Sequence, residues 1–224
     1  MGIFNISNKL NWPKYLVEYE KANAHGPTKN TPLDQLHLVV IDIETTGLSK
    51  NDLVIAIGGI GITNLTIHMD DILDITVNQH DIDINQSITI HGIMPGEIAK
   101  GVPPATALEN FFLFIGNKII VGHHVSFDIR LLNSMAGSLY KGMKILNPTI
   151  DISLLFKRLQ HFGSPYPIDP GTMTLDSISE HFGVEITDRH TACGDAFITA
   201  QVLLKLLSWA KKRGINNAGD LLKR

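Results

Sequence analysis

Three strand-like segments in a row, followed by helical and strand segments in alternation, limit the folds that this chain can adopt. The first is the apolar run that begins at Leu36. Residues 53–63 and 66–78 follow it, with a turn at Asn64 between them. Strands joined by such short turns pair antiparallel, whereas strands separated by helices pair in parallel. The order of the segments therefore predicts an α/β fold of three layers around a mixed sheet.

Helical segments are recognised by apolar side chains at helical spacing. A short, fully apolar strand at 119–122 lies between two of them, as expected inside a parallel sheet. Within 53–63, Gly58, Gly59 and Gly61 predict that another part of the chain approaches the backbone closely. Helices are expected at 12–24, 104–116 and 127–135, from an apolar segment near 150 to 159, at 174–182 and at 191–213.

The length of 224 residues suits one α/β domain with a substantial core. A polar stretch at 25–32, punctuated by Gly and Pro, indicates a linker. We therefore expect an N-terminal helical extension and linker at 1–32, the main domain at 33–213 and a short C-terminal segment at 214–224.

The formal net charge of −3 argues against a broad basic surface for nonspecific nucleic-acid binding. It leaves open a small site where metal ions supply the positive charge. One cysteine, Cys193, rules out an internal disulfide and suits a reducing compartment. The sequence contains neither a secretory signature nor an apolar stretch long enough to span a bilayer. We expect a cytoplasmic protein with no membrane partner.

Two acidic residues, Asp42 and Glu44, end the first strand-like segment. Side chains two apart in a strand project to the same face, so these carboxylates lie side by side. Such a pair needs a bound cation, a shared proton or full solvation. The chain then turns at 45–48, so the pair lies at the carboxyl end of a strand, where open α/β sheets place ligand sites.

Two further acids lie near predicted helix starts. Ser126 is a favourable N-cap, which places Asp128 in the first turn of a helix. A functional carboxylate and one that only complements the helix dipole are equal alternatives for Asp128. Asp195 opens the longest helix among residues that must pack on the sheet. His190, five residues earlier, is expected in the loop before that helix, free to reach a substrate, although a lone histidine there is commonly structural. Carboxylate ligands without thiols favour Mg²⁺ or Mn²⁺ over zinc.

Three segments together carry a family resemblance: Asp42–Leu48 (DIETTGL), His123–Asp128 (HHVSFD) and His190–Ala196 (HTACGDA). They resemble, in order, the three motifs of the DEDDh 3′–5′ exonucleases, and most nearly the epsilon-type proofreading subunit of bacterial DNA polymerase III. The resemblance covers about Leu36 to Leu207. It implies a ribonuclease-H-like, three-layer fold with a five-stranded mixed sheet flanked by helices.

The resemblance also implies roles for individual residues. Two ions, Mg²⁺ or Mn²⁺, would lie about 3.5–4 Å apart, as in two-metal phosphodiester hydrolysis. His190 would act as general base, and nucleoside 5′-monophosphates would be released. Leu48 and Phe127 would stack or wedge against the terminal base, although either is more commonly core. The implied metal ligands are Asp42, Glu44, Asp128 and Asp195, and the implied substrate contacts are Thr45, Thr46, Gly47, Leu48, His91 and Phe127.

The expected partner is the 3′ end of a nucleic acid, with DNA favoured over RNA. Thr45 carries that preference, because the similar oligoribonuclease branch typically has Met at this position. Association with a DNA polymerase is compatible with the resemblance, but we expect no long tethering tail after Lys211. The alternatives are an exoribonuclease that trims short RNA and, from another class, a catalytically silent nucleic-acid-binding module.

Overall fold

A five-stranded mixed sheet forms the middle layer of the molecule, in a computed structural model that describes residues 12–47, 49, 52–79, 93–160 and 170–223. The strand order is β3-β2-β1-β4-β5. Strands β1, β2 and β3 pair antiparallel, and β4 and β5 continue the sheet in parallel with β1. Their bounds are Leu38–Thr45 (β1), Val54–Thr63 (β2), Thr66–Thr76 (β3), Ile119–Gly122 (β4) and Thr149–Asp151 (β5). The predicted mixed sheet is confirmed.

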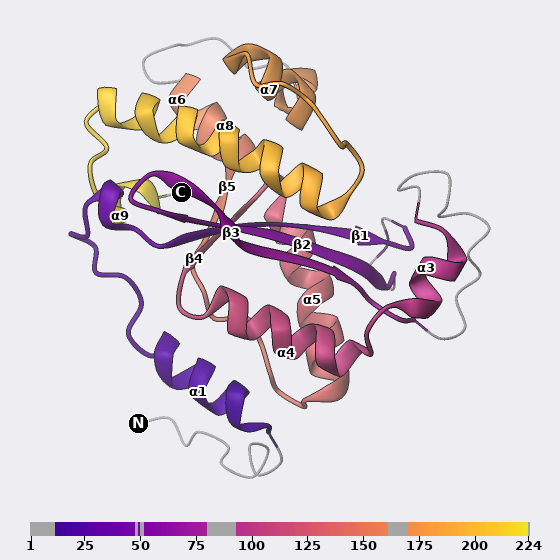
Figure 1. The fold of residues 1–224 in the computed structure, drawn as a ribbon. Helices are drawn as coiled ribbons and strands as arrows, with labels where there is room; N and C mark the ends of the chain where they lie inside the picture. Colours follow the sequence, from indigo (N-terminus) through magenta and orange to yellow (C-terminus); the bar gives the residue numbers. More distant parts are fainter. Residues whose placement is uncertain (1–11, 48, 50–51, 80–92, 161–169, 224) are drawn as a thin grey trace.

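Helices cover both faces of this sheet (Figure 1). Helices α6, α7 and α8 pack on one face, and α1, α4 and α5 pack on the other. A short helix, α3, precedes α4, and α9 follows α8. The bounds are Lys14–Asn23 (α1), Pro95–Lys100 (α3), Pro104–Ile115 (α4), Val125–Leu139 (α5), Ile152–Gln160 (α6), Leu175–Phe182 (α7), Ala192–Lys212 (α8) and Ala218–Leu221 (α9). Single-turn 3₁₀ helices lie at Leu33–Gln35 (η2) and Pro170–Met173 (η4).

Strand β1 separates two apolar clusters by the alternation of its side chains. Leu38 and Val40 belong to the cluster under α6, α7 and α8, whereas Val39 and Ile41 belong to the cluster with α1, α4 and α5. All four side chains are buried, which explains why this strand is a continuous apolar run. The same alternation directs residue 42, and then residue 44, toward the face that α8 covers.

The start of α5 differs from the prediction. The N-cap is His124, whose backbone is left-handed with φ of 56° and whose side chain makes no capping hydrogen bond. The prediction of Ser126 as N-cap is wrong, because the helix begins directly after the tight turn that follows β4. A Cβ on Gly122 would lie 3.0 Å from the side chain of Val125. Asp128 nevertheless falls in the first turn, as expected.

Helix α1 contributes to the core. Leu16 is fully buried, and the ring of Tyr19 packs edge-on against Phe112 of α4 with centroids 4.8 Å apart. The Tyr19 hydroxyl accepts a hydrogen bond from the Leu146 backbone N–H at 2.7 Å and donates one to Asn147 Oδ1. The division of the chain at residue 32 stays a prediction. Among the described residues, no helix is both long enough and apolar enough to cross a membrane.

Candidate active site

The carboxyl end of β1 and the start of α8 meet because β2 carries a glycine between them. Asp42 pairs with Gly58 across the sheet. A Cβ on Gly58 would lie 2.1 Å from the carbonyl carbon of Ala192 and 2.3 Å from the amide nitrogen of Cys193. Only a residue without a side chain permits α8 to begin this close to the sheet. The predicted close approach at the glycines of β2 is confirmed at this position.

Three carboxylates converge at that contact. Asp42 and Glu44 point from β1 toward α8, and Asp195 lies in the first turn of α8. Each offers an oxygen, and the three oxygens all lie within 4.8 Å of one another. Asp195 is buried, and both acids of β1 are partly buried. The structure thus brings together three of the four acids in the predicted set.

Asp128, the fourth acid, is buried on α5 beside this group but is not one of the three mutually close residues. It is near enough to act electrostatically on Asp42. Burial raises the pKa of Asp128 well above its usual range, and the charges of Asp151 and Glu44 raise it further. The carboxylate of Asp151 already has hydrogen-bond donors. Its Oδ1 accepts from the backbone N–H of Ser153 at 2.9 Å and from the Ser153 hydroxyl at 2.6 Å.

Burial and mutual repulsion make this cluster costly when every carboxyl group is ionised. Burial raises the pKa of Asp42 well above its usual range, and the charges of Asp128, Asp195 and Glu44 add to the shift, whereas Arg189 opposes it. The pKa of Glu44 rises from 4.5 to about 7, first through burial and then through Asp195, again opposed by Arg189. A bound divalent cation would offset both the cost of burying these charges and their mutual repulsion.

Two oxygens of the cluster lack a hydrogen-bond donor. Asp128 Oδ2 and Asp195 Oδ1 are buried and have no partner within the described part of the chain. A buried acceptor without a donor is costly and uncommon in folded proteins, and a cation bound by these two oxygens would offset that cost. Carboxylate oxygens are the ligands that Mg²⁺ and Mn²⁺ prefer. The donor set therefore fits the predicted hard divalent cations.

The loop before α8 holds His190 in a constrained backbone. Asp188 and His190 both have positive φ, 53° and 63°. The hydroxyl of Thr191 caps α8 by accepting the N–H of Gly194 at 3.1 Å, and it donates to the Asp188 carbonyl at 2.8 Å. A Cβ on Gly194 would lie 2.1 Å from the Asp188 carbonyl oxygen, so the loop folds tightly on the helix end. His190 is exposed and lies outside the helix, as predicted.

The family profile named RNase T, described as exonuclease, matches residues 39–203. The chain belongs to the exonuclease family. This confirms the predicted resemblance at the level of the family.

Curated relatives of this chain carry names that refer to DNA polymerase III. A DNA polymerase III subunit epsilon-like protein of Rhodobacter capsulatus is 32% identical over 196 residues, which are 86% of this chain and 27% of that protein. The PolC-type DNA polymerase III of Bacillus subtilis is 30% identical over 190 residues, which are 84% of this chain and 13% of that protein. The chain therefore spans about a quarter or less of the length of these two relatives.

Solved structures agree in fold. Exonuclease I of E. coli, in complex with an oligonucleotide, matches with a TM-score of 0.65 at 15% identity, over 80% of this chain and 43% of that one. Cell-death related nuclease 4 matches with a TM-score of 0.66 at 16% identity, over 81% of this chain and 66% of that one. The predicted ribonuclease-H-like fold is confirmed.

The turn after β1, expected to contact substrate, is held by its own side chains. Thr45 donates its hydroxyl to the Gly47 carbonyl at 2.6 Å. The Thr46 hydroxyl donates to Asp52 at 3.1 Å and accepts the Leu53 N–H at 3.0 Å. Both hydroxyls are thus engaged within the turn, and the Thr46 N–H is engaged as well, because it donates to the Leu53 carbonyl at 3.0 Å.

The remaining predicted contacts are less defined. Phe127 is partly buried in α5, packs against the cluster of α4 and α5, and lies under the guanidinium of Arg130 at 5.1 Å. Its contact with a nucleotide base stays a prediction. Leu48 and His91 lie outside the described residues.

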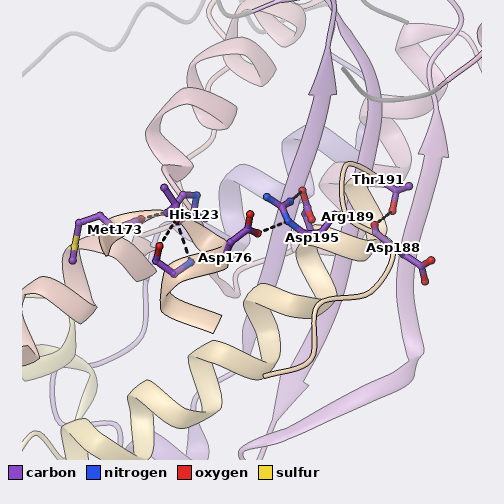
Figure 2. A network of polar contacts seen from close by, with 9 residues as sticks. His123, Met173, Asp176, Asp188, Arg189, Thr191 and Asp195 are labelled. Atoms are coloured by element: carbon purple, nitrogen blue, oxygen red, sulfur yellow. Dashed lines mark hydrogen bonds and ion pairs between the residues drawn. The ribbon is translucent and has the colours of Figure 1, made fainter. Parts of the chain in front are cut away.

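Sequence reasoning missed Arg189. Figure 2 shows its guanidinium between Asp176 of α7 and Asp195 of α8. Its Nε donates to Asp176 Oδ1 at 2.7 Å, and its Nη1 donates to Asp195 Oδ2. A basic residue directly before the motif histidine was the available signal, but nothing in the sequence indicated its two partners.

Proposed function

We propose that this chain is a divalent-metal-dependent 3′–5′ exonuclease that removes nucleotides from the 3′ end of DNA as nucleoside 5′-monophosphates. The observation that supports it most is the convergence of Asp42, Glu44 and Asp195 from two distant parts of the chain. The buried oxygen of Asp195 without a donor supports the same conclusion, because a cation would satisfy it.

Four acids would hold the ions. Asp42, Glu44 and Asp195 would share one cation, and Asp128, whose Oδ2 lacks a donor, would hold a second together with Asp42. When bound, Mg²⁺ or Mn²⁺ ions supply the positive charge that orients the phosphodiester, makes the attacking water more acidic and stabilises the departing 3′-oxygen. The fixed helix start and strand end keep the carboxylates in place for that role.

His190 would accept the proton of the attacking water. It is exposed on a loop whose backbone is fixed by the Thr191 cap, so its imidazole is available to a substrate beside the acidic cluster. Imidazole exchanges protons near neutral pH, as a general base requires. The backbone of the turn at Thr45 to Gly47, directly after Glu44, would contact the terminal nucleotide.

DNA is the proposed substrate because relatives matched along most of this chain are named as a DNA polymerase III subunit epsilon-like protein and a PolC-type DNA polymerase III. A role in replication or repair in the cytoplasm, with a polymerase as partner, belongs to the same proposal. A short RNA would be the substrate if the activity were that of an exoribonuclease.

The experiment compares three substrates that carry a 5′ label: single-stranded DNA, a duplex with a mismatched 3′ end, and short RNA. Each is incubated with Mg²⁺, with Mn²⁺ or with chelator. We expect stepwise shortening of DNA from its 3′ end, and chelator should abolish it. Asp42→Asn should lose this activity, and His190→Ala should lower its rate by about 100-fold or more. Glu185→Gln is the control, because Glu185 is exposed and is not among the three mutually close acids.

The outcomes separate the candidate functions. Shortening of RNA alone would indicate an exoribonuclease. Binding of all three substrates without product would indicate a silent binding module. Equal activity in Asp42→Asn would show that these carboxylates are not the catalytic site.

A further inference from the structure

We propose that Arg189 is a positioning residue, anchored by Asp176, that fixes the carboxylate of Asp195 in the orientation needed to bind a divalent cation. The inference deepens the proposed function and rests on it for the identity of the site. It concerns the geometry of one ligand, and not contact between Arg189 and substrate.

The guanidinium joins two helices that are separate in the sequence. Asp176 lies in the first turn of α7, and Asp195 lies in the first turn of α8. Different nitrogens serve the two partners, Nε for Asp176 and Nη1 for Asp195 (Figure 2). The planar, rigid fork of arginine suits such a bridge, since fixing one nitrogen fixes the direction of the others.

The bridge gives a hydrogen-bond donor to only one of the two oxygens of Asp195. Oδ2 accepts from Arg189, whereas Oδ1 is buried and has no donor in the described part of the chain. The terminal torsion of an aspartate is soft, so a carboxylate without a fixed partner samples a broad range of orientations. Arg189 holds one oxygen and thereby directs the other. Removing a hydrogen bond of this kind from a metal-ligating carboxylate typically weakens metal binding by about 10- to 100-fold.

The charge of Arg189 is balanced where it enters the site. A free guanidinium beside a cation site would repel the incoming ion. Here Asp176 pairs with the guanidinium at 2.7 Å, which reduces the net positive charge that comes with its hydrogen bond to Asp195. The Arg189 side chain is 23% exposed and that of Asp176 is 59% exposed, which places the anchor on the solvent side and the bond to Asp195 on the buried side.

The test measures Mn²⁺ binding without relying on activity. Thermal unfolding is followed during Mn²⁺ titration in wild type, Arg189→Gln, Arg189→Lys and Asp176→Asn. We expect the Mn²⁺ concentration for half-maximal stabilisation to rise about 10-fold or more in Arg189→Gln and Asp176→Asn. Arg189→Lys should not restore it, because a single ammonium cannot span both partners. The double variant Arg189→Gln/Asp176→Asn should lose no more than Arg189→Gln, since the two residues act as one unit.

Kinetics supply the second measurement. At saturating Mn²⁺, kcat should largely recover in Arg189→Gln, and KM for DNA should be unchanged. Arg213→Gln is the matched control, because its guanidinium stacks on Trp209 at the other end of α8. It should leave the Mn²⁺ midpoint unchanged.

Several results would overturn the proposal. Unchanged or tighter Mn²⁺ binding in Arg189→Gln would mean that the arginine is dispensable or competes with the ion. Full function in Arg189→Lys would mean that charge alone matters, and a raised KM for DNA with a normal Mn²⁺ midpoint would make Arg189 a substrate contact. Wild type that binds Mn²⁺ but cleaves no substrate would contradict the proposed function and leave the Arg189 inference standing.

Discussion

Replacing Gly58 by alanine tests whether the acidic cluster depends on how closely α8 approaches the sheet. The added Cβ would lie 2.1 Å from the Ala192 carbonyl carbon and 2.2 Å from its oxygen. Both are backbone atoms and cannot rotate away. Because ordinary contact begins near 3.4 Å, the start of α8 and strand β2 must separate by about 1 Å.

Two losses follow from that separation. Overpacking of this kind costs about 1–3 kcal/mol of unfolding free energy, which for a chain of this size lowers Tm by roughly 2–4 °C per kcal/mol. The carboxylate of Asp195 also moves away from Asp42 and Glu44, whose oxygens now lie within 4.8 Å of its own. Since Mg²⁺ requires oxygen ligands at about 2.0–2.1 Å, we expect at least about a 10-fold weaker response to divalent cations.

The assay is thermal unfolding in chelator and then across a Mn²⁺ titration, with Gly137→Ala as the matched control. Gly137 lies in α5, and a Cβ there would meet no atom within 4 Å. The free energy of unfolding of that control should rise by about 0.5–1 kcal/mol, because alanine is a better helix former than glycine. A Gly58→Ala protein with wild-type Tm and a wild-type Mn²⁺ midpoint would refute the reasoning, since α8 would then not need this contact.

Three further predictions concern stability. The pKa of Glu44 is raised from 4.5 to about 7, so without metal this group makes the folded protein lose stability as pH rises between these values. Glu44→Gln should remove the contribution of Glu44 to that loss and raise the unfolding free energy by about 1–3 kcal/mol above pH 7 in urea unfolding, with no increase near pH 4. Divalent cation should reverse the order of the two proteins, and an equal gain at pH 4 would contradict the account. Tyr19→Phe should cost about 1–3 kcal/mol, because it leaves the buried Asn147 oxygen without its donor; no loss in the same assay would show that water replaces it. Thr191→Ala should cost about 1 kcal/mol by uncapping α8, and an unchanged Tm would contradict that.

The sequence carried enough information for the sheet and for most of the acidic cluster. The apolar run of β1 and the turn at Asn64 depend on local pattern, and the strands formed where that pattern placed them. Asp42 and Glu44 share a face because strand alternation requires it. Their approach to Asp195 depends on Gly58. The sequence predicted that some part of the chain approaches the glycines of β2 closely, but it did not show that this part is the start of α8.

Other parts of the site depend on tertiary position and left little local signal. The bridge from Arg189 to Asp176 requires the relative placement of α7 and α8, which no spacing within either segment reveals. Ser126 satisfied the usual preference for an N-cap, yet the turn after Gly122 started the helix earlier and made His124 the cap. Local preference was overruled there by the path of the chain.

The position of β1 in the middle of the sheet affects how the molecule opens. β2 pairs with it along one side, β4 pairs with its first three residues, Leu38 to Val40, on the other side, and apolar clusters cover both its faces. Amide protons of such a strand exchange with solvent only when the whole domain unfolds. Asp42 and Glu44 follow this doubly paired stretch directly on the same strand, so removal of a bound cation should leave the strand folded and ready to bind a cation again.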